Sequence, residues 1–410
     1  METSKEQNCV AAPEILLPAE GTDMTAWAVI ACDQHTSDEE YWNALDAFVG
    51  ERPSTLRLML PEIWLEKADC GERIRAIAAA MERYRAGGIF RKLPRGYILV
   101  ERKTESSPLR TGIVLSVDLE AYSYEKKSDA LVRATEATIL ERIPPRLKIR
   151  EAASLEFPHV MLLYDDPQDT VLGPYKADAS LKTLYDFELN MGGGHIRGKF
   201  IPDDGAVAAA FQKLAAGGLL FMVGDGNHSL ATAKAAWEKI KTGLTQEERE
   251  THPARFALCE AVNIYDEGIR FEAIHRLVKG VDPQRFAAGL RPGGAGKAGL
   301  YVRGARTDFA VAEEIPAAAE EIPAAVDGVD RYIASYIAEY GGSVDYIHGE
   351  GALAQLTAGH ADYVGIALPK MKKADLFQAV KTGGSLPRKT FSMGESEEKR
   401  YYLEGKEIRL

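Results

Sequence analysis

The sequence has few of the residues that mark disulfide-rich proteins or zinc proteins. Its 410 residues include four cysteines, which lie 23, 38 and 189 positions apart, at Cys9, Cys32, Cys70 and Cys259. This spacing provides neither the paired cysteines of a zinc motif nor a dense disulfide framework. The eight histidines include no His-x-x-x-His pair, so a zinc site has little support. We therefore expect reduced cysteines and a cytoplasmic setting.

Positive charge and long apolar runs are also scarce. Fifty Lys and Arg residues stand against 61 Asp and Glu residues, which gives a net charge of -11. This balance excludes a basic nucleic-acid binder, and it means that an anionic substrate must be held by a local group of donors. No run approaches the roughly 18 apolar residues of a membrane helix. We expect neither a nucleic-acid nor a membrane partner, and the oligomeric state stays open, with a homo-oligomer among the alternatives.

The composition and length predict a globular protein of more than one domain. Hydrophobic residues make up 46% and charged residues 27% of the chain, as in ordinary globular proteins. Alternating strand and helix patterns predict an α+β or α/β fold. A glycine-rich change in composition begins near residue 281. We therefore expect a mixed-sheet, phosphate- or nucleotide-binding domain over residues 1–280 and a smaller α/β unit over residues 281–410 that contributes a basic loop.

Hydrophobic periodicity and turn residues predict the individual elements. Apolar runs predict strands at 26–31, 96–103, 111–119, 159–166, 218–223, 256–266, 269–278, 344–349 and 362–369. Amphipathic or capped patterns predict helices at 70–88, 128–143, 203–218, 229–243, 331–342, 352–360 and 373–384. The two strands at 96–103 and 111–119 should form a hairpin. Pro144 and Pro145 should end the helix at 128–143, because proline cannot continue a helical ladder.

The clearest candidate site is the turn between the strand at 218–223 and the helix that follows it. The turn consists of Gly224, Asp225, Gly226, Asn227, His228 and Ser229. Glycines permit positive φ, and the first N–H groups of a helix can bind a phosphate. The aspartate could hold a magnesium ion or accept a proton, and the last three residues supply side-chain donors. The same residue types are common in turns and N-caps for local reasons, so a purely structural turn is the alternative.

Two further candidates lie in or beside predicted strands. His275 and Arg276 are neighbours in one strand, so their side chains point to opposite faces and one of them could reach an anion. A salt-bridged strand surface is the alternative. Asp33 and His35 follow the strand at 26–31, where open α/β sheets tend to bind ligands. A plain helix cap explains that segment equally well.

Two charged segments complete the candidates. Arg133 and Glu136 lie three residues apart on a predicted helix and would share a face, which a solvated ion pair also explains. Arg388, Lys389 and Thr390 lie in a predicted loop and could supply positive charge to a phosphate. A loop that merely carries surface cations is the commoner case.

Five segments together resemble a known family. They are ACDQHTSDEEYW, RATEATILERIPPR, VGDGNHSLATAKA, FEAIHRLV and LPRKTFSMGE. They occur in the order seen in the uncharacterised bacterial and archaeal family called domain of unknown function 1015, and the resemblance spans nearly the whole chain. The usual central motif of that family is Asp-Gly-His-His-Arg. This chain keeps the acid, the glycine and the second histidine as Asp225, Gly226 and His228, but Ser229 replaces the arginine.

A similar motif occurs in free-serine kinases of the ParB/sulfiredoxin-like fold, where it serves nucleotide phosphates. By analogy, the resemblance implies a phosphotransferase that acts on a small hydroxy compound such as free serine, with a nucleotide (ATP or ADP) as donor and Mg²⁺ as cofactor. A phosphoserine-type phosphatase and a non-enzymatic nucleotide or metabolite sensor are the alternatives. Either Arg276, Arg388 or Lys389 replaces the missing arginine, or this branch binds something less anionic.

The leading hypothesis gives each candidate a role. Asp225, His228 and Glu136 are the predicted catalytic residues, and Asp225 is also the predicted metal ligand. The predicted phosphate- and substrate-binding residues are Gly224, Gly226, Asn227, Ser229, Arg133, His275, Arg276, Asp33, Arg388 and Lys389. Phosphoryl transfer is mostly positioning and electrostatics, so such a set suffices if it converges in space.

Overall fold

The computed structural model describes residues 9–136, 138–290, 297–310 and 321–409. The chain divides into two compact units. Unit 1 contains the described residues up to 134, together with 138–269 and 395–409. Unit 2 contains Thr135, Glu136 and the described residues from 270 to 394. Unit 2 is therefore an insertion in the sequence of unit 1, and the last residues of the chain return to unit 1.

Unit 1 is built on a large mixed sheet. Its strands are β1 (Val10–Ala11), β2 (Glu14–Pro18), β4 (Phe90–Lys103), β5 (Arg110–Asp118), β6 (Tyr122–Ser123), β7 (Val132–Ala134), β9 (Met161–Tyr164), β10 (Thr183–Glu188), β11 (His195–Pro202), β12 (Phe221–Asp225) and β13 (Phe256–Asn263). The order is β10-β11-β4-β5-β13-β9-β12-β7-β6, with β1 on β5 and β2 on β4. Strand β13 is antiparallel to β5 and parallel to β9, so both directions occur in one sheet.

Two short ribbons complete the strands of unit 1, and both use the end of the chain. Strand β3 (Val29–Ile30) pairs with β20 (Tyr401–Tyr402), and β8 (Leu155–Glu156) pairs with β21 (Lys406–Glu407). The register of the first ribbon sets Tyr402 opposite Val29. These pairings bring the segment 395–409 into unit 1.

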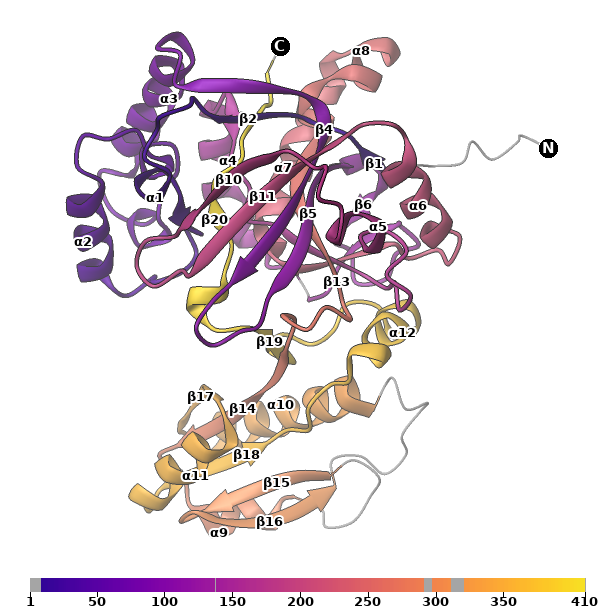
Figure 1. Ribbon diagram of the computed structural model, residues 1–410. Helices are drawn as coiled ribbons and strands as arrows, with labels where there is room; N and C mark the ends of the chain where they lie inside the picture. The colour runs from indigo at the N-terminus through magenta and orange to yellow at the C-terminus, as the bar shows by residue number, and fades with distance from the viewer. Residues whose placement is uncertain (1–8, 137, 291–296, 311–320, 410) are drawn as a thin grey trace. The chain divides into compact units, whose positions relative to one another are not determined.

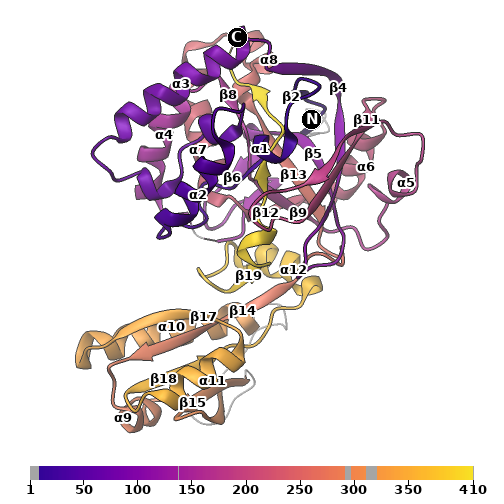
Figure 2. The same ribbon diagram turned by 60° about the vertical axis from the view of Figure 1, so that its left-hand side comes forward.

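Helices cover both faces of this sheet. They are α1 (Met24–Trp27), α2 (Glu39–Val49), α3 (Cys70–Ala86), α4 (Ile143–Ala152), α5 (Gly173–Lys176), α6 (Ala206–Ala215), α7 (Asn227–Ile240) and α8 (Gln246–Thr251). Single 3₁₀ turns lie at 55–57, 62–64, 119–121, 140–142, 241–243, 253–255 and 396–398. Figures 1 and 2 show α2 and α3 on one side of the sheet and α5 and α6 on the other.

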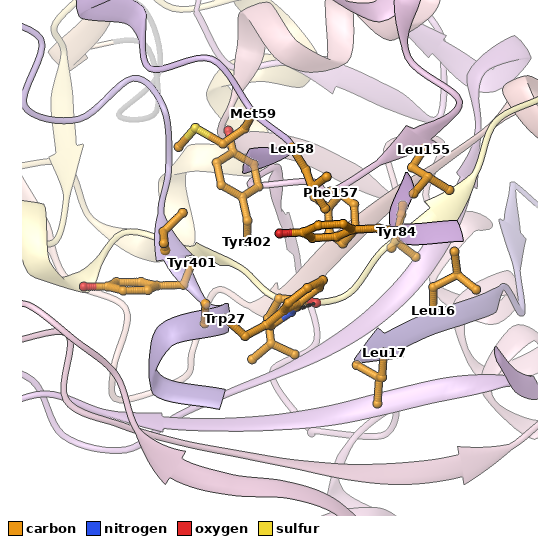
Figure 3. Packing of buried hydrophobic residues seen from close by; sticks show 14 of the residues in the cluster. Leu16, Leu17, Trp27, Leu58, Met59, Tyr84, Leu155, Phe157, Tyr401 and Tyr402 are labelled. Atoms are coloured by element: carbon orange, nitrogen blue, oxygen red, sulfur yellow. Dashed lines mark hydrogen bonds between the residues drawn. The ribbon is translucent and has the colours of Figure 1, made fainter. Parts of the chain in front are cut away.

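The sheet separates two hydrophobic cores because successive residues of a strand point to opposite faces. In β4, Ile98 enters one core and Leu99 the other. The first core gathers around Trp27, and Figure 3 shows Tyr84 and Phe157 next to its indole ring. The indole N–H of Trp27 donates to the carbonyl oxygen of Leu403 at 2.9 Å. The second core includes residues of α6 and α7.

Unit 2 is a smaller sheet between two helices. Its strands are β14 (Phe271–Lys279), β15 (Lys297–Val302), β16 (Ala305–Ala310), β17 (Ser343–His348), β18 (Tyr363–Ala367) and β19 (Phe391–Met393), and its helices are α9 (Pro283–Ala288), α10 (Glu321–Tyr340), α11 (Glu350–Gly359) and α12 (Lys373–Gly383). The order is β16-β15-β18-β14-β17, with β19 on β14. Every pairing among these described strands is antiparallel. Helix α10 packs on a core that contains Val278, and α11 packs on one that contains Leu277.

The predicted α+β class with a mixed sheet is confirmed, as is the hairpin, which β4 and β5 form. The unit boundary falls at residues 269 and 270 rather than near 280, because the backbone of β14 pairs with β17, β18 and β19 of unit 2. The end of the predicted C-terminal unit belongs to unit 1 because β20 pairs with β3 there. Most of the glycine-rich segment after residue 290 lies outside the described residues.

Two element predictions are wrong. Residues 26–31 do not form one strand, because Asp23 caps the short helix α1 by accepting from the N–H groups of Thr25 and Ala26. Residues 128–143 do not form one helix, because part of this segment is the strand β7, which pairs in parallel with β12. Pro144 and Pro145 do not end a helix. They lie in the first turn of α4, where the absence of a backbone N–H costs no hydrogen bond.

Candidate functional site

The predicted strand, turn and helix at residues 218–243 are present in unit 1. Strand β12 ends at Asp225, and α7 begins at Asn227, with Gly226 as its N-cap. Gly226 has a φ of 78°, in the left-handed region that favours glycine. A Cβ atom at Gly226 would lie 3.0 Å from the Cα of Val160. A glycine cap brings no side-chain oxygen to the first N–H groups of α7, which carry the positive end of the helix dipole.

Asp225 links this turn to the end of the chain. Its Oδ2 lies 3.2 Å from Nζ of Lys399, and its Oδ1 accepts from the N–H of Gly226 at 2.9 Å. The Asp225 and Lys399 side chains are 22% and 19% exposed, so a ligand can reach both of them. An acid and a lysine therefore lie together where α7 starts.

A buried histidine connects the turn to the predicted Asp33. Nε2 of His159 lies 3.2 Å from Oγ of Ser229 and 3.6 Å from Oδ2 of Asp33. Nδ1 of His159 lies 2.7 Å from the hydroxyl of Tyr402, which comes from the returning C-terminal segment. His159 is 4% exposed, so these contacts determine its chemistry. The structure thus joins Asp33 and Ser229 through a residue that the sequence does not mark.

The electrostatics of this cluster favour an ion pair. Burial favours neutral forms, but the charge of Asp33 and its hydrogen bond outweigh burial and raise the pKa of His159, with a further contribution from Asp225. Burial likewise opposes ionisation of Asp33, but His159, then Gln34 and Lys399, hold the pKa of Asp33 well below its usual range. The pair thus favours the protonated form of His159 beside the carboxylate of Asp33, and the protonated ring can donate hydrogen bonds from both nitrogens.

A pocket of about 160 Å³ borders Ser229 and His159 in unit 1. Arg146, from α4, lines it together with Glu62, and Nε of Arg146 donates to Oε1 of Glu62 at 2.9 Å. Arg146 belongs to the segment RATEATILERIPPR, but its local sequence gives no sign of this position. The pocket lies beside the turn, along the flank of α7.

The other predicted residues of unit 1 lie in or next to the turn. Gly224 and Asp225 end β12, and Asn227, His228 and Ser229 form the first turn of α7. Arg133 lies on the neighbouring strand β7, opposite Met222, and its Nε donates to the carbonyl oxygen of Ala130 at 2.8 Å. Burial lowers the pKa of Arg133. Since β7 is a strand, Arg133 and Glu136 do not share a helical face.

Apart from His35, the remaining predicted residues belong to unit 2, where Arg276, Lys389 and Glu136 form a separate network. Arg276 is fully buried, its Nε and Nη2 donate to the carboxylate of Asp330 at 2.8 Å each, and its Nη1 donates to the carbonyl oxygens of Ile274 and Lys389. The N–H of Lys389 donates to Glu136 at 3.2 Å. An anion would have to displace these partners of Arg276. Arg388 and Lys389 are exposed. Their roles in phosphate binding stay predictions.

His275 and His35 have local partners. Nδ1 of His275 accepts from the N–H of Leu368 at 3.2 Å, and burial lowers the pKa of His275. His35 stacks on Tyr41 with ring centroids 3.6 Å apart. Neither contact involves the turn before α7.

Two negative findings apply to the described residues. Within them, no group of three or more His, Cys, Asp or Glu side chains is placed to hold a metal ion. The helices in that part of the chain include none that is long and apolar enough to cross a membrane.

Sequence reasoning missed His159, Lys399, Tyr402 and Arg146. His159 begins an apolar strand segment, and Lys399 and Tyr402 lie in a charged segment near the end of the chain. The first three reach the site through the pairing of β20 with β3 and the entry to β9. No spacing in the local sequence predicts that these three residues reach the site.

The solved structures to which this chain is similar share little sequence identity with it. No curated protein matches it. SbnI with a C-terminal truncation, from Staphylococcus aureus, is 12% identical, with a TM-score of 0.38 over 72% of this chain and 87% of that chain. A free serine kinase in complex with AMP is 12% identical, with a TM-score of 0.37 over 73% and 92%. A conserved hypothetical protein from Pyrococcus furiosus is 13% identical, with a TM-score of 0.34 over 73% and 95%.

A family model shows where the chain belongs. The model described as "Protein of unknown function (DUF1015)" matches residues 16–332. This range contains β12, Gly226 and α7, as well as Asp33 and His159. Because the family model matches most of the chain, this protein is a member of the DUF1015 family.

Proposed function

We propose that this protein is a phosphotransferase that binds a nucleotide, ATP or ADP, at the start of α7 and transfers a phosphoryl group to a small hydroxy compound. One observation carries the proposal: the glycine-capped start of α7 lies beside Lys399 and the ion pair of His159 and Asp33. Free serine is the acceptor that the sequence resemblance suggests.

The electrostatics support an anionic ligand at this place. A net charge of -11 repels anions over most of the surface, so binding needs local positive charge. The start of α7 carries about half a positive charge, and Lys399 adds to it, as does His159 in the protonated form that Asp33 favours. Each charged donor on a phosphate typically contributes about 1.5–3 kcal/mol.

The predicted transfer follows from these groups. The acceptor hydroxyl attacks the terminal phosphorus, so that a new O–P bond forms and the P–O bond to the rest of the nucleotide breaks. The hydroxyl proton passes to the carboxylate of Asp225. Lys399, His159 and the N–H groups of α7 stabilise the charge that develops on the phosphoryl oxygens.

Mg²⁺ fits this site as a companion of the nucleotide. It commonly uses one or two protein carboxylates and takes its other ligands from phosphates and water, so it needs no cluster of acids. Asp225 is partly exposed, and its Oδ2 contacts only the side chain of Lys399 among the ion pairs described above. The ion could take the place of Lys399 at this oxygen, so Asp225 is the residue that would hold it. The ion would neutralise charge on the transferred phosphoryl group.

The cluster does not favour a serine nucleophile. In a catalytic triad the carboxylate holds one ring nitrogen of the histidine, and the other nitrogen takes the serine proton. Here Asp33 and Ser229 approach the same nitrogen, Nε2 of His159, and Tyr402 occupies the other. The raised pKa of His159 also favours the form in which Nε2 carries a proton, and that form cannot take the proton of Ser229.

Thermal shift with ATP, ADP, CTP, serine and phosphoserine, each with and without Mg²⁺, tests the binding step. A ligand at 100 times its Kd stabilises the fold by about 2.7 kcal/mol, which gives a readable increase in Tm. Lys399→Met should weaken nucleotide binding by about 10- to 100-fold, through the loss of one charged donor. If no phosphorylated compound raises the Tm, the proposal is wrong.

Asp225→Asn tests the chemical step. It keeps the shape of the side chain but removes the proton acceptor, so turnover should disappear while Tm stays close to that of the wild type. Asp204→Asn is the matched control, because Asp204 also accepts from a backbone N–H in a turn before a helix. Turnover that survives in Asp225→Asn contradicts the proposal, and unfolding of this variant would identify Asp225 as a structural cap. Phosphate release from phosphoserine without a nucleotide would identify a phosphatase instead. Nucleotide binding without turnover would identify a sensor.

A further inference from the structure

The pocket beside Ser229 and His159 is formed by parts of unit 1 that converge on α7. Its walls come from α4, from the segment 58–65, from residues 155–160 and from Leu230 and Ala233 on α7. Helices α4 and α7 pack directly on one another, so the pocket has a fixed wall. The hydroxyl of Tyr402 and the ring of His159 form its end nearest to the turn.

Most of the side chains that line the pocket are apolar. Figure 3 shows Leu58, Met59, Phe157 and Tyr402 gathered in this region, with Leu155 farther along the same cluster. These residues belong to the first core of unit 1, so the pocket opens onto the core itself. Such a wall favours an apolar group, because water in contact with it has few partners.

The charged residues around the pocket are largely engaged with one another. Nη2 of Arg150 donates to Glu156 at 2.6 Å, and the other oxygen of Glu156 accepts from the N–H of Leu258 at 2.8 Å. Arg146 is paired with Glu62. The polar contacts that a ligand can make are therefore concentrated at the end formed by Ser229 and His159.

The size of the pocket limits the ligand. A volume of about 160 Å³ is close to that of an apolar protein cavity of about 150 Å³ that binds benzene. Free serine has two charged groups and a single methylene, so it would leave the apolar wall uncovered and would lose hydration without compensation.

We propose that the acceptor is a hydroxy compound with an apolar group of about the size of benzene, which occupies this pocket while its hydroxyl extends past Ser229 and His159 toward Asp225. The inference rests on the proposed function, because it describes the acceptor of the same site. It changes the expected substrate class from an amino acid to an alcohol with an apolar body.

A series of straight-chain alcohols tests the pocket without any need for turnover. Ethanol, 1-butanol, 1-hexanol and 1-octanol serve as probes, and ligand-observed NMR titration gives the Kd of each. Each buried methylene should lower the Kd about fourfold until the pocket is full, near six carbons, after which the gain should stop. A Kd that does not depend on chain length would overturn the inference.

Two alanines on α7 provide a matched pair of variants. Ala233 lines the pocket, so Ala233→Leu should fill part of it and weaken 1-hexanol binding at least tenfold. Ala235, two residues along the same helix, does not line the pocket, so Ala235→Leu should bind 1-hexanol as the wild type does. Leu65→Ser, at a half-exposed position of the wall, gives a second variant in case Ala233→Leu does not fold, and it should also weaken binding. Equal affinity in Ala233→Leu and Ala235→Leu overturns the inference.

The failure of this inference and the failure of the proposed function can be told apart. ATP binding that depends on Lys399, without chain-length dependence for alcohols, would overturn the acceptor class and support the nucleotide site. If the Kd of the alcohols depends on chain length but no nucleotide binds, the pocket does not hold a phosphoryl acceptor, and both this inference and the proposed function are overturned. With ATP and Mg²⁺ present, the inference also requires that benzyl alcohol be phosphorylated faster than serine, and the reverse order overturns it.

Discussion

Gly226→Ala is the most direct test of the geometry at the start of α7. Gly226 caps α7 with a φ of 78°, and a Cβ atom there would lie 3.0 Å from Cα of Val160 and 3.3 Å from Cδ2 of His159. Gly205 offers a matched control. It caps α6 in the same left-handed conformation, with a φ of 82°, but a Cβ atom there would meet no heavy atom within 4 Å.

The two substitutions share one cost and differ in another. A left-handed conformation costs an alanine about 1–2 kcal/mol, so Gly205→Ala should lower the free energy of unfolding by about that amount. Gly226→Ala must also displace the backbone at Val160, and overpacking of this kind costs about 1–3 kcal/mol more. The effect of alanine on the unfolded chain is common to both variants and cancels in the comparison.

Urea unfolding followed by tryptophan fluorescence measures this difference. The four tryptophans, Trp27, Trp42, Trp64 and Trp237, all belong to unit 1, so the signal reports the unit that contains both glycines. We expect Gly226→Ala to be less stable than Gly205→Ala by about 1–3 kcal/mol. Equal stability of the two variants would show that the turn before α7 does not contact residues 159–160 closely.

Two further predictions concern the ion pair in unit 1 and the buried arginine of unit 2. The raised pKa of His159 means that its charge stabilises the fold below about pH 6.5 and that this contribution disappears as the pH rises through the folded-state pKa. The difference in unfolding free energy between the wild type and His159→Gln, measured from pH 5 to 9, should therefore shrink as the pH rises, and a difference that does not vary with pH contradicts the ion pair. Arg276→Met leaves the carbonyl oxygens of Ile274 and Lys389 without their donor, at a cost of about 1–3 kcal/mol each. Hydrogen exchange at residues 385–390 should accelerate at least tenfold while tryptophan-detected unfolding of unit 1 stays unchanged, and unaltered exchange would show that Arg276 does not hold this loop.

The parts of the fold that the sequence predicts well are those that local interactions determine. The apolar run at 218–223, the glycines after it and the helical spacing beyond them lie within a few turns of one another, so strand β12, the turn and α7 follow from the sequence. The hairpin of β4 and β5 follows for the same reason. In these segments local preference and tertiary structure agree.

The segment 128–143 shows why local reasoning fails elsewhere. Its charged residues and its two prolines suit a helix that ends at residue 143, and they suit equally a new helix that begins there, since proline is tolerated in a first turn. The pairing of Val132 with Phe221 decides between these alternatives, and that contact joins residues 89 positions apart. A preference that is satisfied by two structures cannot select one of them.

The candidate site was predictable in part for the same reason. Asp33, Asp225 and Ser229 stand out because turn residues follow apolar strands, which is a local pattern. His159 and Lys399 carry no such pattern, and only their contacts with Asp33 and Asp225 give them a role. For Arg276 the strand pattern left an anion site and a salt bridge as alternatives, and in the structure Asp330 and two carbonyl oxygens accept from its donors.

The return of residues 395–409 to unit 1 sets an order of events during synthesis. Strand β3 lies near the beginning of the chain, but its partner β20 is made more than 370 residues later, together with Lys399 and Tyr402. A nascent chain that has already completed the sheet and α7 still lacks these groups, and the indole of Trp27 still lacks its acceptor at Leu403. The first core contains Tyr401, Tyr402 and Leu403, so it can close only after these residues have left the ribosome.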